Sequence, residues 1–163
     1  MPEKKTIERA QEDKREGKAP TTQAGEFVRE EMEHIRKGKH GARSSKQAIA
    51  IGLSKARRAG VKLPPPAPGT ATEKTRESAK RALKRAGKKT SPIRSRAITG
   101  ALKREGRSAA SKPALAKQAK TAAKRRGPAA RSAAAKKAVR TKGPAKRSAA
   151  AKKAARTRAR KRA

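Results

Sequence analysis

The side chains of this 163-residue sequence that could do chemistry are mostly lysine and arginine, which together number 49 against 12 aspartate and glutamate residues. Their ammonium and guanidinium groups donate hydrogen bonds to phosphate and neutralise its charge. The net charge of +37 therefore predicts a polyanionic partner. No acidic residue follows Glu105, so the 21 basic residues in positions 106–163 have no opposite charge among them.

Many of these basic residues recur in a direct repeat of 16 residues. Residues 127–142 read GPAARSAAAKKAVRTK and residues 143–158 read GPAKRSAAAKKAARTR, and 13 of the 16 positions match. Each unit begins with Gly-Pro, which interrupts a helix, and continues with alanine and lysine, which favour one. The repeat has no apolar face, so we expect a periodic carrier of charge and not a stacked solenoid.

We predict that basic residues in three regions of the chain contact phosphates. Duplex DNA is favoured over RNA, because many RNA and single-strand binders stack bases on aromatic side chains and this sequence has one phenylalanine and no tyrosine or tryptophan. The predicted nucleic-acid-binding residues are Arg43, Lys46, Lys55, Arg57, Arg58, Lys62, Arg94, Arg96, Lys124, Arg125, Arg126, Arg131, Lys136, Lys137, Arg140, Lys146, Arg147, Lys152, Lys153, Arg156, Arg158, Arg160, Lys161 and Arg162.

The other polar residues predict no catalytic, cofactor or metal site. His34 and His40 are not spaced i, i+4, and the sequence has no cysteine to complete a zinc site, so we expect solvated histidines. The three carboxylates of Glu30, Glu31 and Glu33 are expected to form a solvated helix face without a pocket. We therefore expect that the protein is not an enzyme and uses no cofactor.

Two helices are predicted in the N-terminal part of the chain. Apolar residues at helical spacing predict the first, which ends at Gly38: Ala24, Phe27, Val28, Met32 and Ile35. The pair Ser44 and Gln47 forms a capping-box pattern at the start of the second, and Pro64-Pro65-Pro66 ends the unit. The short Gly-containing connection favours a helical hairpin.

The supply of large apolar residues limits the size of the core. Leucine, isoleucine, valine and phenylalanine number 15 in 163 residues, about 9%, where roughly 20% marks the boundary of disorder. We therefore predict a mostly α and largely disordered chain, with a small N-terminal helical hairpin followed by a basic low-complexity tail whose helices are conditional on charge neutralisation.

The charge pattern divides the sequence into four predicted parts. Residues 1–63 form a small helical head, acidic over 1–33 and basic over 34–63, and residues 64–70 form a Pro-rich linker. Residues 71–106 form a basic helical segment, and residues 107–163 form the Ala/Lys/Arg-rich tail with the repeat at 127–158. A small head with a like-charged tail is typical of an interaction tail.

The stretch TQAGEFVREEMEHIRKGKHGARSSKQAIAIGLSKARRAGVKLPPP, residues 22–66, resembles a family of small basic bacterial proteins of unknown function, and the resemblance extends over about residues 1–66. It implies no activity and transfers no functional residue. The tail is similar in composition to linker histone tails and to bacterial histone H1-like proteins, which implies DNA association and condensation. Ser91-Pro92-Ile93-Arg94 likewise resembles the Ser-Pro-x-Lys/Arg element of linker histones, although a serine N-cap followed by proline is the favoured explanation of this single copy.

We expect nonspecific duplex DNA binding and compaction by a histone H1-like, nucleoid-associated protein. The alternatives are an RNA- or ribosome-associated basic protein, and a head that binds itself or a protein partner through residues 1–63 with the tail as a nonspecific tether. A membrane-spanning segment is not expected, because the longest apolar run, residues 48–53, is too short to span a bilayer. Binding to an anionic membrane surface is the weakest alternative, because the tail lacks the Trp, Phe and Leu face that such helices bury. The N-terminus lacks a signal-peptide pattern, so the expected location is cytoplasmic.

The carboxylates of Glu26, Glu30, Glu31 and Glu33 are hypothesised to compete with DNA for the tail.

Overall fold

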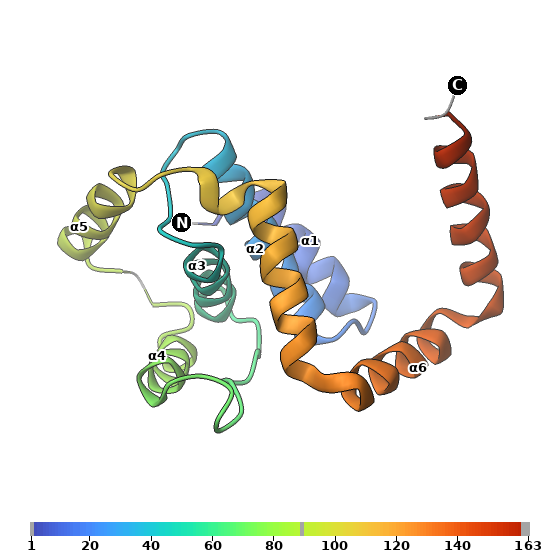
Figure 1. Ribbon diagram of the computed structural model, residues 1–163. Coiled ribbons are helices and arrows are strands. Elements are labelled where there is room, and N and C mark those ends of the chain that lie inside the picture. The colour runs from blue at the N-terminus through green and yellow to red at the C-terminus, as the bar shows by residue number, and fades with distance from the viewer. Residues whose placement is uncertain (1, 89, 161–163) are drawn as a thin grey trace. The chain divides into compact units, whose positions relative to one another are not determined.

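The computed structural model of the chain describes residues 2–88 and 90–160, except for the side chains of residues 141 and 142. Contacts divide the chain into two compact units, Met1–Gln118 and Ala119–Ala163. The described residues form six α-helices and one 3-10 helix (Figure 1): α1 (Lys4–Arg15), α2 (Pro20–Arg36), α3 (Ser45–Arg58), α4 (Glu73–Lys84), α5 (Pro92–Lys103), η1 (Ser108–Ala110) and α6 (Lys112–Arg160).

The prediction of a largely disordered chain with conditional helices is wrong, because about three quarters of the residues are helical. Two physical terms explain the difference. Alanine, lysine and arginine are among the strongest helix formers, so the tail segments favour helix despite their charge. In the first unit, alanines that a count of large apolar residues ignores are fully buried, among them Ala24, Ala48, Ala56 and Ala110.

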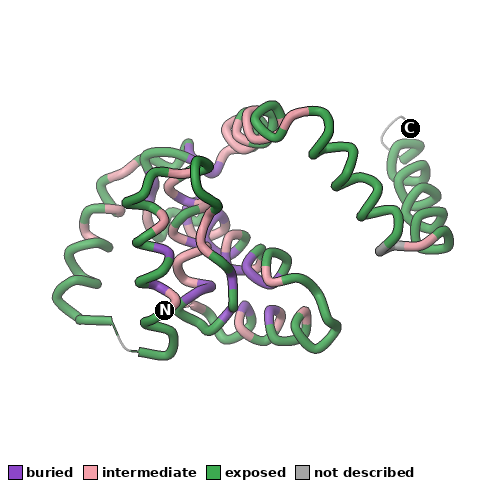
Figure 2. The backbone as a smooth tube through the Cα atoms, turned by 90° about the horizontal axis from the view of Figure 1, so that it is seen from below, coloured by how far each residue is buried: buried purple, intermediate pink, exposed green. Residues whose placement is uncertain are grey.

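The core of the first unit consists of two clusters of small and apolar side chains. One gathers Phe27 of α2 with Ala56 of α3 and with Val61 and Leu63 beyond it. The other gathers Met32 and Ile35 of α2 with residues of α3 and η1. Figure 2 shows that the buried residues lie in the first unit, whereas the described part of the second unit is almost entirely exposed.

Helices α2 and α3 form the centre of this unit and approach each other closely. A Cβ atom added to Gly52 of α3 would lie 2.7 Å from the Cα atom of Val28 in α2. The Ser44 hydroxyl accepts a hydrogen bond from the Gln47 backbone N–H at 3.2 Å and caps α3. The Gln47 side chain accepts one from the Arg43 N–H at 2.8 Å, close to the reciprocal bond of the predicted capping box.

The first unit is larger than the predicted hairpin. Helix α1 contacts α2, and its Thr6 and Ala10 are buried. Helix α4 contacts α3, and its Ala79 and Ala82 are buried. Because α1, α4 and η1 all pack on the α2–α3 pair, the hairpin is the centre of a larger helical unit.

A segment far along the sequence also binds the loop between α2 and α3. The Gly41 N–H donates to the Leu102 carbonyl at 2.9 Å, and the Ala42 N–H donates to the Gly106 carbonyl at 3.0 Å. A Cβ atom on Gly41 would lie 1.9 Å from the Glu105 carbonyl oxygen, so this approach requires glycine. The Ser45 hydroxyl donates to the Ala109 carbonyl at 2.6 Å. The segment on both sides of the predicted boundary at 106/107 therefore belongs to one compact unit.

The second unit consists of the part of α6 that follows Gln118. Helix α6 is interrupted at Gly127 (φ 71°, ψ 168°) and at Gly143 (φ 66°, ψ 170°), and Pro128 and Pro144 follow these glycines. The two units of the sequence repeat thus begin with the same backbone kink. This conformation is essentially restricted to glycine, so the repeat encodes the geometry as well as the charge.

We predict that Gly52→Ala lowers the free energy of unfolding by about 1–3 kcal/mol, because the added methyl group would overlap the α2 backbone. Gly25→Ala in α2 is the matched control, since nothing lies within 4 Å of a Cβ at this exposed position. It should raise stability by about 0.5–1 kcal/mol through helix propensity. Urea unfolding of the full chain, followed by circular dichroism, measures both, and equal shifts of the same sign would contradict the α2–α3 contact.

Candidate nucleic-acid interface

The predicted phosphate-binding residues of the tail lie on the surface of α6. Within the first repeat unit they occupy two sides of the helix: at ~100° per residue, Lys136, Lys137 and Arg140 fall within an arc of about 100°, and Arg131 lies on the opposite side. The exposed residues of this set are Lys124, Arg125, Arg126, Arg131, Lys136, Lys137, Arg140, Lys146, Arg147, Lys152, Lys153, Arg156, Arg158 and Arg160. The predicted Lys161 and Arg162 lie outside the described residues.

Four of the six predicted residues in the head are also exposed. Arg43 precedes α3, Lys46 lies in its first turn, Arg58 ends it, and Lys62 follows it. Nothing covers these four side chains within the part of the chain that the structure describes. They can therefore meet a phosphate without any rearrangement of the first unit.

Lys55, the fifth predicted head residue, has a structural partner instead. Its ammonium nitrogen lies 2.6 Å from Oε2 of Glu31 and 3.8 Å from Oε1 of Glu30. Both carboxylates belong to α2 and are buried, Glu31 completely. Lys55 therefore neutralises the negative charge of buried carboxylates on α2. A phosphate would have to compete with these two carboxylates for the Lys55 ammonium group.

Arg57, the sixth, is buried and holds the chain that leaves α3. Its Nε donates to the Leu63 carbonyl at 3.2 Å, and a terminal guanidinium nitrogen donates to the Pro64 carbonyl at 3.1 Å. Burial of the guanidinium lowers its pKa from the usual value. The structure therefore assigns Arg57 to the turn after α3 and not to the surface.

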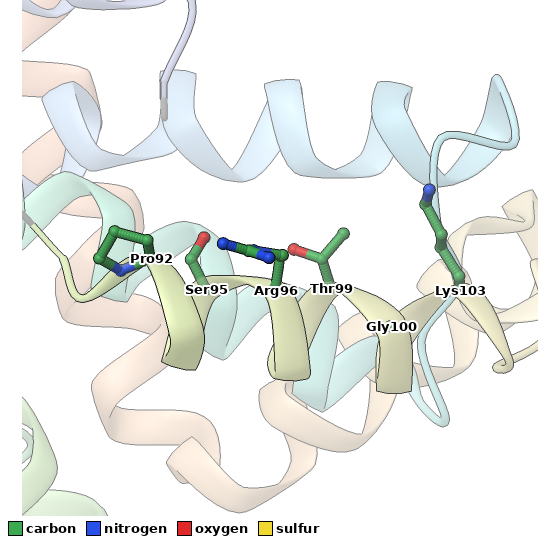
Figure 3. Close-up of a pocket in the computed structure, with 6 residues that line it drawn as sticks. All are labelled: Pro92, Ser95, Arg96, Thr99, Gly100 and Lys103. Carbon is green, nitrogen blue, oxygen red and sulfur yellow. The ribbon is translucent and has the colours of Figure 1, made fainter.

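Helix α5 presents Arg94 and Arg96 on an element without a buried residue. Arg96 is one of the residues lining an open pocket of about 440 Å³, together with Pro92, Ser95, Thr99, Gly100 and Lys103 (Figure 3). Ser91 occupies the N-cap position and Pro92 the first turn, but the Ser91 side chain makes no capping hydrogen bond. The pocket offers the cations of Arg96 and Lys103 and the hydroxyl groups of Ser95 and Thr99. These groups can bind an anion, and they are equally typical of a solvated helix surface.

Several acidic residues of α1 and α2 are paired within the first unit. Glu26 contacts Arg9 at 3.0 Å and Arg29 at 3.6 Å, and Glu33 contacts Arg29 at 3.6 Å. Since Glu30 and Glu31 are buried, the hypothesis that they compete with DNA for the tail is wrong for these two residues. The prediction of a solvated Glu30–Glu31–Glu33 face fails for the same pair.

Sequence reasoning also missed where the histidines lie. The side chains of His34 and His40 are each only 12% exposed, and both contact carboxylates: Glu3 lies 2.8 Å from His34 Nε2 and Glu31 lies 3.4 Å from His40 Nε2. The prediction of solvated histidines is therefore wrong. The sequence did carry a signal for the burial of Glu31, the partner of His40, because Phe27, Glu31 and Ile35 are spaced i, i+4, i+8 and so share the apolar face of α2.

Glu3, which directly precedes α1, fastens the start of that helix to this cluster. Its backbone N–H donates to Oε2 of Glu30 at 3.2 Å, and its Oε1 accepts from the Lys39 ammonium at 2.9 Å. Hydrogen bonds from His34 and Lys39 lower the pKa of the Glu3 carboxyl from 4.5 to about 2. The charged carboxylate is therefore the form that the folded chain favours.

Residues 17–66 match DUF6496, a family of unknown function. This match confirms the predicted resemblance of the head to an uncharacterised family. No curated protein and no solved structure matches the chain. The matched range contains α2, α3 and the loop that joins them, and it ends before α4, so it assigns neither an activity nor a role for the tail.

We predict that Lys55→Met lowers the free energy of unfolding by about 3 kcal/mol, because it leaves the buried Glu31 carboxylate without its cation. Lys18→Met is the control: Lys18 lies 2.6 Å from Glu16 and 2.7 Å from Asp13, but none of these three side chains is buried, so the midpoint should move far less. Chemical denaturation of the two full-length variants makes the comparison. Adding Glu31→Gln to Lys55→Met should restore part of the loss, and a further loss of the same size would contradict the pairing.

We also predict a pH-dependent contribution from Glu3. A carboxyl whose pKa is lower in the folded chain stabilises it above the unfolded pKa of 4.5 and loses this effect as the pH falls towards about 2. The stability difference between wild type and Glu3→Gln should therefore be largest above pH 5 and shrink steadily below it. Urea unfolding at a series of pH values measures this difference, and a constant one would rule out the contribution.

Proposed function

We propose that this chain, whose family match names no activity, binds duplex DNA without sequence preference through the phosphates. The observation that carries the proposal is the surface of α6, where the predicted basic residues of the described part are exposed. No carboxylate side chain follows Glu105 to neutralise them. Lysine and arginine in such a setting release counterions when they meet phosphates, which drives association at low salt.

The distribution of aromatic residues supports a duplex over a single strand. Phe27 is the only aromatic residue among phenylalanine, tyrosine and tryptophan in the sequence, and it is 1% exposed in the core. It cannot stack with a base, which is the contact that most single-strand binders use. Contacts to the backbone of a duplex need no such platform.

The form of the two repeat units suits compaction. Each unit is a helix with cations on opposite sides, and the Gly-Pro kinks separate successive helices. Such a helix can meet phosphates of more than one duplex, or of two turns of the same duplex. A compacting protein of this kind would associate with a nucleoid.

The exposed lysine and arginine side chains of the first unit could also bind phosphates. Arg43, Lys46, Arg58 and Lys62 surround α3 without internal ion pairs in the described structure, while Lys55 and Arg57 serve the interior. Any contribution of the head should therefore come from the first four residues. Lys55 and Arg57 should affect folding first and DNA binding only through it.

We predict that Lys152→Gln, Lys153→Gln and Arg156→Gln together weaken binding to a labelled random duplex and make it less dependent on salt. Each phosphate contact contributes about 0.9 to the log–log slope of affinity against salt, so the slope should fall by about 2 to 3. Fluorescence anisotropy of the full chain across a salt series gives the slope. Glutamine keeps helix propensity close to that of lysine and arginine, so α6 should be retained.

The matched control removes the same number of charges from α1. Lys4, Lys5 and Lys14 are exposed, and their change to glutamine lowers the net charge by the same amount. The control should keep the wild-type slope. Equal losses in both triple variants would mean that total charge and not α6 governs binding, and an unchanged slope in the α6 variant would overturn the proposal. Competition with a single strand and with structured RNA tests the preference for duplex DNA.

A further inference from the structure

One group of side chains in the first unit is unrelated to phosphate binding. Glu31 and His34 lie on the same face of α2, and His40 lies in the loop between α2 and α3. Each offers one potential ligand atom, and these three atoms lie within 4.8 Å of one another. The two imidazole rings are nearly perpendicular, with centroids 6.2 Å apart. Two imidazoles and a carboxylate in this arrangement are a common donor set for transition metals.

The Glu31 carboxylate is incompletely satisfied. The residue is 0% exposed, and neither of its oxygens makes a hydrogen bond of acceptable geometry within the described residues. The Lys55 ammonium compensates the charge at Oε2, from which it lies 2.6 Å. Oε1 faces the His40 ring instead. A buried carboxylate oxygen without a donor is costly, so this oxygen needs a cation or a proton.

The ring of His40 is oriented so that the lone pair of its Nε2 faces Oε1 of Glu31. Its Nδ1 lies 3.0 Å from the Gly41 carbonyl oxygen, which can only accept, so Nδ1 carries the hydrogen. In the neutral ring Nε2 is then an acceptor, and it lies 3.4 Å from Oε1 of Glu31. Two acceptors facing each other repel unless a positive centre lies between them. Ligands about 2.0–2.1 Å from a tetrahedral zinc ion are about 3.3–3.4 Å apart, which agrees with this separation.

The surroundings provide outer-shell partners and a suitable charge. The Glu3 carboxylate lies 2.8 Å from Nε2 of His34, and carboxylates beside ligand histidines commonly fix the orientation of the ring. Around the cluster, the carboxylates of Glu3, Glu30 and Glu31 face the ammonium groups of Lys39 and Lys55. With neutral histidines this leaves one negative charge, so a divalent cation can enter although the whole chain is strongly basic.

From this geometry we propose that Glu31, His34 and His40 bind one divalent transition-metal ion, with Zn²⁺ as the ion that the donor set favours. Oε1 of Glu31 ligates the metal while Oε2 keeps Lys55. Calcium and magnesium are disfavoured, because they take oxygen ligands and two of the three donors are nitrogens. The ion ties the His40 loop to α2, next to the backbone contacts of that loop with residues 102–106. It thereby stabilises the first unit, independently of DNA binding.

The wild-type chain allows a direct test, because its two histidines are the only ones in the sequence. The full chain is treated with a chelator, and Zn²⁺ is then added while the ring nitrogen signals of the histidines are followed by NMR. We expect both rings to change together and saturate at one equivalent of zinc. Ring signals that do not respond, or that respond separately without saturation, would overturn the site.

A variant pair identifies the ligands. Co²⁺ is titrated into the full chain, and its visible ligand-field bands report a site of tetrahedral type. His40→Gln should remove the bands and the rise in melting temperature that one equivalent of metal gives to the wild type. Glu33→Gln is the control, because it removes a carboxylate from the same helix that lies outside the cluster and is partly exposed. Bands retained in His40→Gln, or lost in Glu33→Gln, would contradict the assignment, and the NMR result decides if His40→Gln does not fold.

Discussion

The ion pair between the buried Glu31 and the partly exposed Lys55 is the interaction on which the arrangement of the first unit depends. It joins α2 to α3 one helical turn from the place where Gly52 meets the Val28 backbone. Such a pair is favourable only when its geometry is good, because both charges lose water. The close backbone approach provides that geometry. It also fixes where the loop after α2 lies, and that loop carries Gly41 and Ala42, on which the segment around residues 102–106 docks.

The sequence predicted the positions of the helices better than it predicted the existence of a fold. Capping at Ser44, the breaks at Gly38 and at the prolines, and the apolar spacing of α2 all depend on local chemistry, which a sequence displays directly. The size of the core depends on packing. Alanines such as Ala24 and Ala56 bury little area each, yet they let helices approach closely enough for Phe27 and Ile35 to become fully enclosed. A count of large apolar residues cannot register this effect.

The residues of the candidate interface also divide into those that local sequence predicts and those that depend on packing. The tail residues were predictable because a helix without an apolar face exposes whatever it carries, and the described basic side chains of α6 from Lys124 to Arg160 are exposed. Lys55 and Arg57 were not, because their partners come from another helix or from a turn seven residues away. The histidines required the same kind of long-range information. His40 approaches Glu31 and His34 of α2 only because the chain reverses after Gly38.

The pairing inside the first unit also bears on how the tail can act. Nine of the 12 acidic residues lie in positions 1–33, where they could in principle neutralise the basic tail. Many of them are instead engaged locally: Glu26 with Arg9, Glu33 with Arg29, Asp13 with Lys18 and Glu31 with Lys55. Each of these ion pairs reduces the net negative charge that the first unit presents at longer range. The cations of α6, which have no acidic side chain in their own segment, are therefore left for the external polyanion that we propose as partner.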